Sequence, residues 1–464
     1  MTSVFSKTNL PTPSRNEYTL HNIMTSHEHS SMSSVNPQAE KLNQTIEKNN
    51  PAVHRMLSEK GKNIFFPKGG ILKQSADAKG KKFNATIGIS TKDDGTPLVL
   101  PSLSHQIGID PKNYAPYAPS FGLMNLRKKW QEKIREKNPS LKGKDISLPV
   151  VTSGLTHGLS IAAYLFLDQE DTLILPDKFW GNYKLIFQNG FGVKLSTFNT
   201  FKNEQFDTKS LEWSLKESPK GKKVVLLNIP NNPTGYTPSE AEADRIVEVL
   251  KQSAEAGNEL VVFCDDAYFG LLYEKGLLSE SLFARLVNLH ENILAVKMDG
   301  ATKEEYAWGF RVAFVTFGGK NLTEETLESF EQKTAGSIRG NISNCCHLSQ
   351  SLLLNLFESE TYEEEKKANY HVLKERYDEV RSILNTNKER FAPYFNPLPF
   401  NSGYFMCIEL TENLDGEQVR QILLKEYDTG VIATGNLIRI AFSAVGKKQI
   451  PELFENIFHA CQSL

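Results

Sequence analysis

Short apolar runs alternate with amphipathic segments through the first two thirds of the chain. Residues 122–137 carry apolar side chains three to four positions apart, which predicts an amphipathic helix, and the largely apolar stretch 158–167 predicts a buried one. Four runs end in loop-forming residues and are expected to be strands: 172–175, 224–228, 260–264 and 293–296. Strands that alternate with helices predict an α/β fold whose sheet is mostly parallel and flanked by helices.

One helix start is marked by local chemistry. Thr237-Pro238-Ser239-Glu240 has the spacing of a capping box with proline at the first helical position. The helix that it opens is expected to run towards Gly257.

The pattern changes after about residue 320. A long charged helix is expected at 363–384, followed by strands at 404–410 and 437–442 with a helix near 417–424 between them. This predicts a smaller α+β domain built from both chain ends. We divide the chain into a disordered extension (1–35), the first part of the small domain (36–100), the large domain (101–325) and the rest of the small domain (326–464).

Composition excludes several classes of function. The 464 residues are 39% hydrophobic, enough for two globular domains, and the formal net charge of -2 is interspersed, which argues against a nucleic-acid or membrane partner. No apolar run approaches the roughly 18 residues that span a bilayer. The cysteines have no metal-ligand spacing, which favours a reduced, cytoplasmic setting, and we expect no metal at His21, His27 and His29.

Polar residues follow each of the four predicted strands. Asn232 follows the second run, Asp265 the third and Lys303 the fourth, while Pro176 to Trp180 follow the first. Ligands of parallel sheets bind beyond the carboxyl ends of the strands, so we expect these segments on one rim. Taken singly, they have plainer interpretations: a surface lysine, a helix-capping aspartate, a core tryptophan.

The joint pattern is more specific. Asn-Pro-Thr-Gly begins at Asn232, Asp-x-Ala-Tyr runs from Asp265 to Tyr268, and Lys303 precedes Arg311 by eight positions. From about residue 117 to 439 the chain resembles the class I/II aminotransferases, pyridoxal-phosphate enzymes of the aspartate aminotransferase superfamily with fold type I. The resemblance implies amino transfer between an α-amino acid and a 2-oxo acid.

The resemblance also implies catalytic and cofactor-binding roles. Lys303 would form the Schiff base and move the proton at the substrate Cα, Asp265 would hold the pyridine nitrogen, and Asn232 and Tyr268 would bind the ring oxygen. The remaining cofactor contacts would come from Arg311 and the amides of Leu155 and Thr156 at the phosphate, Trp180 on the ring, and Tyr117 at the phosphate of a neighbouring subunit. The last match implies a homodimer with shared active sites.

For the substrate, the resemblance implies that Arg439 binds the α-carboxylate, with Gly88 and Asn232 nearby. Arg339 matches an arginine that reads a distal carboxylate, which favours aspartate and the 2-oxoglutarate/glutamate pair. Its plainer interpretation is a surface arginine, and aromatic amino acids stay open as substrates.

Three departures from the family pattern matter. Gly300 replaces a serine that contacts the phosphate, so Thr302 or Ser153 would have to substitute. Phe179 competes with Trp180 for the stacking position, and Cys345-Cys346 replaces a proline pair near Arg339.

A β-lyase, decarboxylase or aminocyclopropane-carboxylate-type synthase on the same scaffold remains an alternative. A ligand-sensing regulator is a third, against which the first 100 residues show no helix-turn-helix pattern.

Overall fold

The computed structural model describes residues 36–49, 62, 70–86, 88–104 and 110–464. The extension expected at 1–35, with its three histidines, lies outside the described residues. Among those that are described, no helix has both the length and the apolar character needed to cross a membrane.

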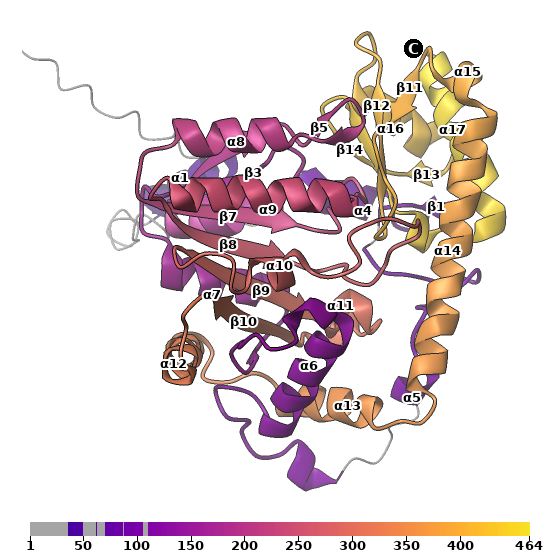
Figure 1. The fold of residues 1–464 in the computed structure, drawn as a ribbon. Coiled ribbons are helices and arrows are strands. Elements are labelled where there is room, and N and C mark those ends of the chain that lie inside the picture. Colours follow the sequence, from indigo (N-terminus) through magenta and orange to yellow (C-terminus); the bar gives the residue numbers. More distant parts are fainter. Residues whose placement is uncertain (1–35, 50–61, 63–69, 87, 105–109) are drawn as a thin grey trace, which may run out of the picture.

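A seven-stranded sheet forms the centre of the molecule (Figure 1). Its strands, in spatial order, are β2 (Val150–Thr152), β10 (Ala313–Gly319), β9 (Ile293–Gly300), β8 (Glu259–Asp265), β7 (Lys222–Asn228), β3 (Thr172–Pro176) and β4 (Lys194–Phe198). β10 runs antiparallel to both its neighbours, whereas the pairs from β9 to β4 are parallel. The predicted mostly parallel sheet is confirmed, and all four predicted strands belong to it.

Helices cover both faces of this sheet because its strands bury side chains on both sides. Val225 and Leu227 of β7 share a core with one helical layer, and Val224 and Leu226 share a core with the other. The first layer holds α6 (Met124–Lys137), α8 (Thr208–Glu217), α9 (Glu240–Glu255) and α10 (Leu282–Leu286). The second holds α7 (Leu155–Phe166), a π-helical segment (Lys184–Gly190) and α12 (Glu324–Asn341).

The start of α9 corrects the predicted capping box. Ser239, not Thr237, is the N-cap, and the carboxylate that completes the box belongs to Glu242. The predicted box was displaced by two residues because Thr237 is held elsewhere: its hydroxyl pairs with that of Ser402 at 2.8 Å.

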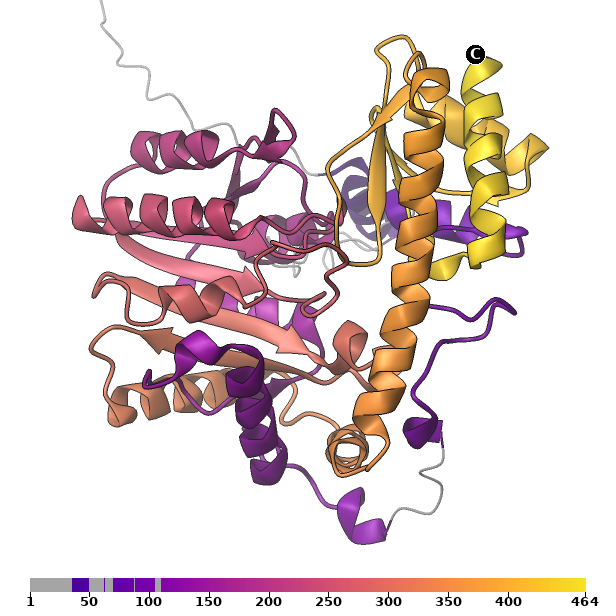
Figure 2. The same cartoon turned by 45° about the vertical axis from the view of Figure 1, so that its right-hand side comes forward.

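A second, smaller sheet lies beside the first, and the long helix α14 (Tyr362–Thr386) runs along its outer side (Figures 1 and 2). Its antiparallel strands are β11 (Phe395–Pro397), β12 (Met406–Leu410), β15 (Leu437–Ile440) and β14 (Ile432–Thr434), packed with α16 (Gly416–Glu426) and α17 (Ile450–Gln462). From the N-terminal part, β1 (Phe83–Asn84) pairs with β13 (Thr429–Gly430), and α4 (Gly70–Asp77) contacts β14. A small domain built from both chain ends is thus confirmed; its exact boundaries stay a prediction.

Short elements complete the described chain. They are α1 (Pro37–Asn49), α5 (Pro101–Ser104), α11 (Ala301–Glu304), α13 (His347–Phe357), α15 (Lys388–Phe391), the hairpin β5 (Phe201–Lys202) and β6 (Gln205–Phe206), and several 3-10 turns.

Candidate active site

The parallel register brings the predicted rim residues together. Asn228 at the end of β7 lies opposite Asp265 at the end of β8, which lies opposite Met298 of β9. β9 ends at Gly300, and α11 begins directly afterwards, so Lys303 is presented within one turn of the strand end. In Figure 1 these ends face the small domain.

Asp265 is buried and held by two donors. The Tyr183 hydroxyl donates to Oδ2 at 2.5 Å, and the Ala267 amide donates to Oδ1 at 3.2 Å. Burial raises the pKa of Asp265, while these hydrogen bonds and the cations of Lys303 and Lys297 act in the opposite direction.

Asn232, Tyr268 and Arg439 form a buried polar group near Asp265. The Asn232 amide nitrogen lies 3.5 Å from the Tyr268 hydroxyl, and its carbonyl oxygen accepts from Arg439 Nη1 at 3.3 Å. Asn228 fixes this loop, because its Oδ1 accepts the Asn232 backbone amide at 2.7 Å. Burial raises the pKa of Tyr268, which keeps its hydroxyl a donor at neutral pH.

The Lys303 amine lies 5.2 Å from the centre of the Tyr268 ring. Burial lowers the pKa of Lys303 to about 8; Asp265 opposes the shift, and the guanidinium groups of Arg311 and Arg439 increase it. A lysine with this pKa is a nucleophile near neutral pH.

An anion-binding corner lies at the start of α7. Gly154 precedes the helix, has φ 80° and offers no side chain to cap it, so within the described residues no N-cap side chain takes up the first amides, those of Leu155 and Thr156. Arg311 reaches the same place: a Cβ at Gly154 would lie 2.2 Å from its Nη2. The corner therefore combines helix amides with a guanidinium.

The structure explains glycine at position 300. A Cβ there would lie 2.7 Å from the Ala313 Cα and 2.8 Å from the Val312 carbonyl, so β10 excludes the family's serine. The neighbouring Thr302 hydroxyl is buried and lacks a hydrogen-bond partner within the described part of the chain.

Arg439 is a buried cation with no acid partner in the described residues. Its guanidinium lies 4.3 Å from the centre of the Phe405 ring, and Nη2 donates to the Thr86 carbonyl at 3.2 Å. Burial lowers its pKa, and the groups that counteract this are Tyr268 and Cys407, both neutral. The Gly88 segment passes close by, since a Cβ there would lie 3.8 Å from the Phe405 ring.

The aromatic segment after β3 packs around Tyr183. Trp180 meets the Tyr183 ring edge-on at 5.7 Å and 84°, whereas Phe179 lies nearly parallel to it at 6.3 Å and 16°. Both are partly buried.

Tyr117 and Arg339 lie on the surface instead of in this group. Tyr117 is 90% exposed, and Arg339 donates to the Ser343 hydroxyl at 2.7 Å. Their segments are neighbours, because the Ser120 hydroxyl donates to the Ser343 carbonyl at 2.7 Å. Exposed apolar side chains gather on the two segments: Tyr114, Tyr117, Met124, Ile342 and Leu348. We call these five residues the exposed apolar patch.

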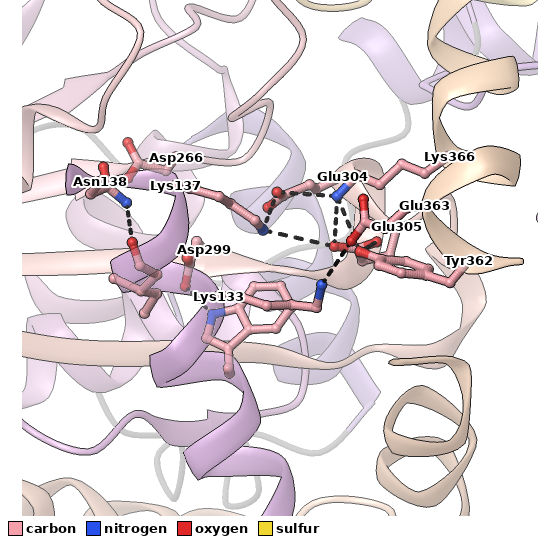
Figure 3. Close-up of polar contacts among 12 residues, drawn as sticks. Lys133, Lys137, Asn138, Asp266, Asp299, Glu304, Glu305, Tyr362, Glu363 and Lys366 are labelled. Carbon is pink, nitrogen blue, oxygen red and sulfur yellow. Dashed lines mark hydrogen bonds and ion pairs between the residues drawn. The ribbon is translucent and has the colours of Figure 1, made fainter. Parts of the chain in front are cut away.

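The two residues that follow Lys303 in the chain, Glu304 and Glu305, belong to an ion cluster between α11, α6 and α14 (Figure 3). Glu304 pairs with Lys137 of α6 and lies 3.4 Å from the Lys366 amine of α14. Glu305 lies 3.0 Å from the Lys366 amine and accepts the Tyr362 hydroxyl at 2.7 Å. We call these five residues the anchoring cluster, because they fasten α11 to α6 and α14.

Several of these residues were not predicted from the sequence. Tyr183, Asn228 and the anchoring cluster contact the predicted residues but come from separate elements. The adjacent glutamates after Lys303, Glu304 and Glu305, were the available signal, since two acids beside an apolar strand require cations if they are buried.

The donor set fits pyridoxal phosphate. An outward-facing helix start with an arginine suits a phosphate, a buried carboxylate suits a ring N–H, and an amide with a phenol suits the ring oxygen. The lysine with a lowered pKa suits the aldehyde.

Comparison with known proteins points the same way. The profile of the family "Aminotransferase class I and II" matches residues 82–457. An aspartate aminotransferase from Sulfurisphaera tokodaii is 23% identical over 62% of this chain and 67% of its own length. One from Bacillus subtilis is 26% identical over 44% of this chain but only 49% of its own length. The chain thus matches about two thirds of the length of the first relative and about half of the length of the second.

Solved structures share the fold over nearly their whole length. An aminotransferase from Anaerococcus prevotii superposes with a TM-score of 0.75 at 26% identity, covering 87% of this chain and 98% of that one. An α-aminoadipate aminotransferase from Thermus thermophilus, complexed with a phosphopyridoxyl-leucine, has a TM-score of 0.69 at 18% identity and covers 89% and 98%. At that identity the second likeness concerns the fold alone.

Proposed function

The chain belongs to the class I and II aminotransferase family, whose members depend on pyridoxal phosphate, and on that premise we propose that it transfers an amino group from an α-amino acid to a 2-oxo acid. One observation carries the proposal: Lys303, with its pKa near 8, shares a buried site with Arg439, a cation that has no acid partner among the described residues. Such a site has more cations than anions, since Asp265 is the carboxylate that faces Lys303, and a phosphate and a substrate carboxylate would balance the excess.

Each residue has a role in this proposal. When bound, the cofactor supplies an electron-withdrawing ring that weakens the substrate's Cα–H bond. Asp265 holds the ring N–H, Asn232 and Tyr268 hold the ring oxygen, and Arg439 orients the substrate through its α-carboxylate. Lys303 Nζ removes the Cα proton of the amino donor and, in the second half of the transfer, delivers a proton to the carbonyl carbon of the 2-oxo acid, which becomes the Cα of the new amino acid.

The phosphate would lie at the start of α7. Arg311 and the amides of Leu155 and Thr156 bind it, and Trp180 covers the ring. Between Thr302 and Ser153 as replacement for the missing serine, we favour Thr302 because its buried hydroxyl has no other partner in the described chain.

We propose that the enzyme is a homodimer that forms through the exposed apolar patch. Five exposed apolar side chains on two adjacent segments are typical of a protein interface, and Tyr117 among them is 90% exposed. In the dimer Tyr117 would reach the partner's phosphate. Light scattering should give twice the mass of one chain, and Met124→Glu should shift the protein towards monomer.

The proposed substrates are the 2-oxoglutarate/glutamate pair with aspartate or an aromatic amino acid. Relatives named as aspartate aminotransferases support the first choice, and one named as an aromatic-amino-acid aminotransferase supports the second. A substitution at Arg339 tests the choice between them. If Arg339 binds a distal carboxylate, Arg339→Ala will raise the KM for aspartate and leave the KM for an aromatic substrate unchanged.

One optical experiment tests the activity. Protein loaded with pyridoxal phosphate should show a visible absorbance band, and L-glutamate alone should bleach it while releasing an equal amount of 2-oxoglutarate. Release of ammonia with pyruvate, or of carbon dioxide, would indicate the lyase or decarboxylase alternative. A protein that takes up no cofactor would exclude the whole proposal.

We also propose a reducing, cytoplasmic setting, because all five cysteines are free thiols. If cells are quenched rapidly and the unfolded protein is then alkylated, all five cysteines should be labelled, and oxidised cysteines would argue against that setting.

A further inference from the structure

Tyr183 is a buried phenol that the proposed chemistry does not use. It lies just before the π-helical segment, is 1% exposed, and donates its hydroxyl proton to Oδ2 of Asp265 at 2.5 Å. At this distance the hydrogen bond is short and charge-assisted. Because the Ala267 amide holds the other oxygen, both carboxylate oxygens of Asp265 have a fixed donor.

Packing prevents the Tyr183 ring from turning away. Trp180 lies edge-on to it at 5.7 Å, Phe187 is tilted against it at 5.9 Å, and its own backbone amide donates to the Trp180 carbonyl at 2.9 Å. The phenol is therefore a rigid donor and not a mobile surface group.

The charges around Asp265 make this donor important. The groups that face it are Tyr183, Tyr268, and the cations of Lys303 and Lys297. Burial and the nearby carboxylate raise the pKa of Tyr183 well above its usual value, so its proton stays on the phenol and is only shared with Asp265.

We propose that Tyr183 is a positioning residue that keeps Asp265 ionised and aimed at the ring nitrogen of the cofactor. A donor on the carboxylate lowers its basicity, so the proton between Asp265 and the ring stays on the nitrogen. The ring then keeps its positive charge and its capacity to withdraw electrons. This inference rests on the proposed function, in which Asp265 binds that nitrogen.

The test uses full-length Tyr183→Phe with two cofactors: pyridoxal phosphate and its carbocyclic analogue, in which CH replaces the ring nitrogen. Loss of a hydrogen bond to a charged group should weaken binding of pyridoxal phosphate about tenfold. The analogue has no nitrogen for Asp265 and should bind both proteins equally. Tyr377→Phe is the matched control, since it removes another buried phenol that donates to a carboxylate, that of Glu274, away from Asp265.

A second readout is the pH midpoint of the cofactor's visible absorbance band. A less charged ring withdraws fewer electrons, so the nitrogen that joins it to Lys303 holds its proton more tightly, and the midpoint should rise in Tyr183→Phe. Asp265, Tyr268, Arg311 and Arg439 also face Lys303 and are unchanged in this variant. In a protein that already carries Asp265→Asn, adding Tyr183→Phe should not move the pH midpoint further.

Each outcome decides something. Equal loss of both cofactors with an unmoved midpoint would reduce Tyr183 to a packing residue and overturn the inference. If Tyr183→Phe fails to fold, 3-fluorotyrosine at position 183 keeps the ring, strengthens the donor and should lower the midpoint; an unchanged midpoint would overturn the inference. Failure of the unmodified protein to bind pyridoxal phosphate or show the band would instead refute the proposed function.

Discussion

Two groups of charges meet at Lys303 and are organised in opposite ways. In the candidate active site, Lys303, Arg311 and Arg439 are near one carboxylate, Asp265, and the pKa of Lys303 falls to about 8 through burial and through the two arginines. In the anchoring cluster, one residue further along the chain, cations and carboxylates pair directly (Figure 3). Burial alone would raise the pKa of Glu304, but Lys137 and Lys366 lower it to about 2.

This difference in charge pairing separates a region that can bind a ligand from one that holds helices together. A cluster whose charges are satisfied internally has nothing left for a ligand and can only hold elements together. A site with excess cations, of which Arg439 is buried and Lys303 half-buried, carries a desolvation cost that an anionic ligand relieves. Placing both on α11 joins a rigid support to a reactive amine.

The largest effect is expected from Lys303→Ala. Turnover should fall by about 10³-fold or more, because the group that moves the substrate proton is gone. The melting temperature of the cofactor-free protein should not fall, since the cation that is removed is half-buried and poorly paired. Retained activity would contradict the assigned role.

A substitution that breaks the anchoring cluster should lower the free energy of unfolding. Glu305→Gln leaves Lys366 without its nearest carboxylate, and breaking a buried ion pair costs about 3–5 kcal/mol in the free energy of unfolding. Urea denaturation measures this. Glu455→Gln is the matched control, because its pair with Arg390 is about 40% exposed on both sides and should cost about 1 kcal/mol or less. Equal losses of unfolding free energy in Glu305→Gln and Glu455→Gln would show that the anchoring cluster is no stronger than a surface ion pair.

Arg439→Ala tests whether the unpaired cation binds the substrate. KM for L-glutamate should rise about 10- to 100-fold, as expected for losing hydrogen bonds to a carboxylate. Folding stability should be unchanged or increased. Steady-state kinetics beside a melting curve separates the two effects, and a large loss of stability without a change in KM would make Arg439 structural.

The smallest effect concerns pH. Cofactor capture requires the neutral Lys303 amine, so with a pKa of about 8 the rate of uptake should rise with pH and level off above 8, not above the usual 10.5. Arg439→Ala removes a cation that lowers this pKa, so its midpoint should lie at higher pH, by a fraction of a unit. Stopped-flow absorbance measures both; a midpoint near 10 in the unmodified protein would show that the amine is not desolvated.

Much of the fold followed from the chain's pattern. The four buried runs became β3, β7, β8 and β9, and the pattern at 363–384 became α14. Strands β2 and β4 were not predicted because β2 has only three residues and β4, Lys-Leu-Ser-Thr-Phe, has no continuous apolar run. The capping box was misplaced by two residues because the side chain of Thr237 pairs with the distant Ser402.

The sequence by itself determined the reactive groups and their order, since Asn232, Asp265, Tyr268, Lys303 and Arg311 lie in local motifs that follow strand-like runs. Only the tertiary structure decided how these groups are supported. Tyr183 meets Asp265 across 82 positions, and Lys366 meets Glu305 across 61. The physical reason is that burial, which lowers the pKa of Lys303 and forces Glu304 and Glu305 to find cations, depends on packing between separate elements, and no local pattern encodes it.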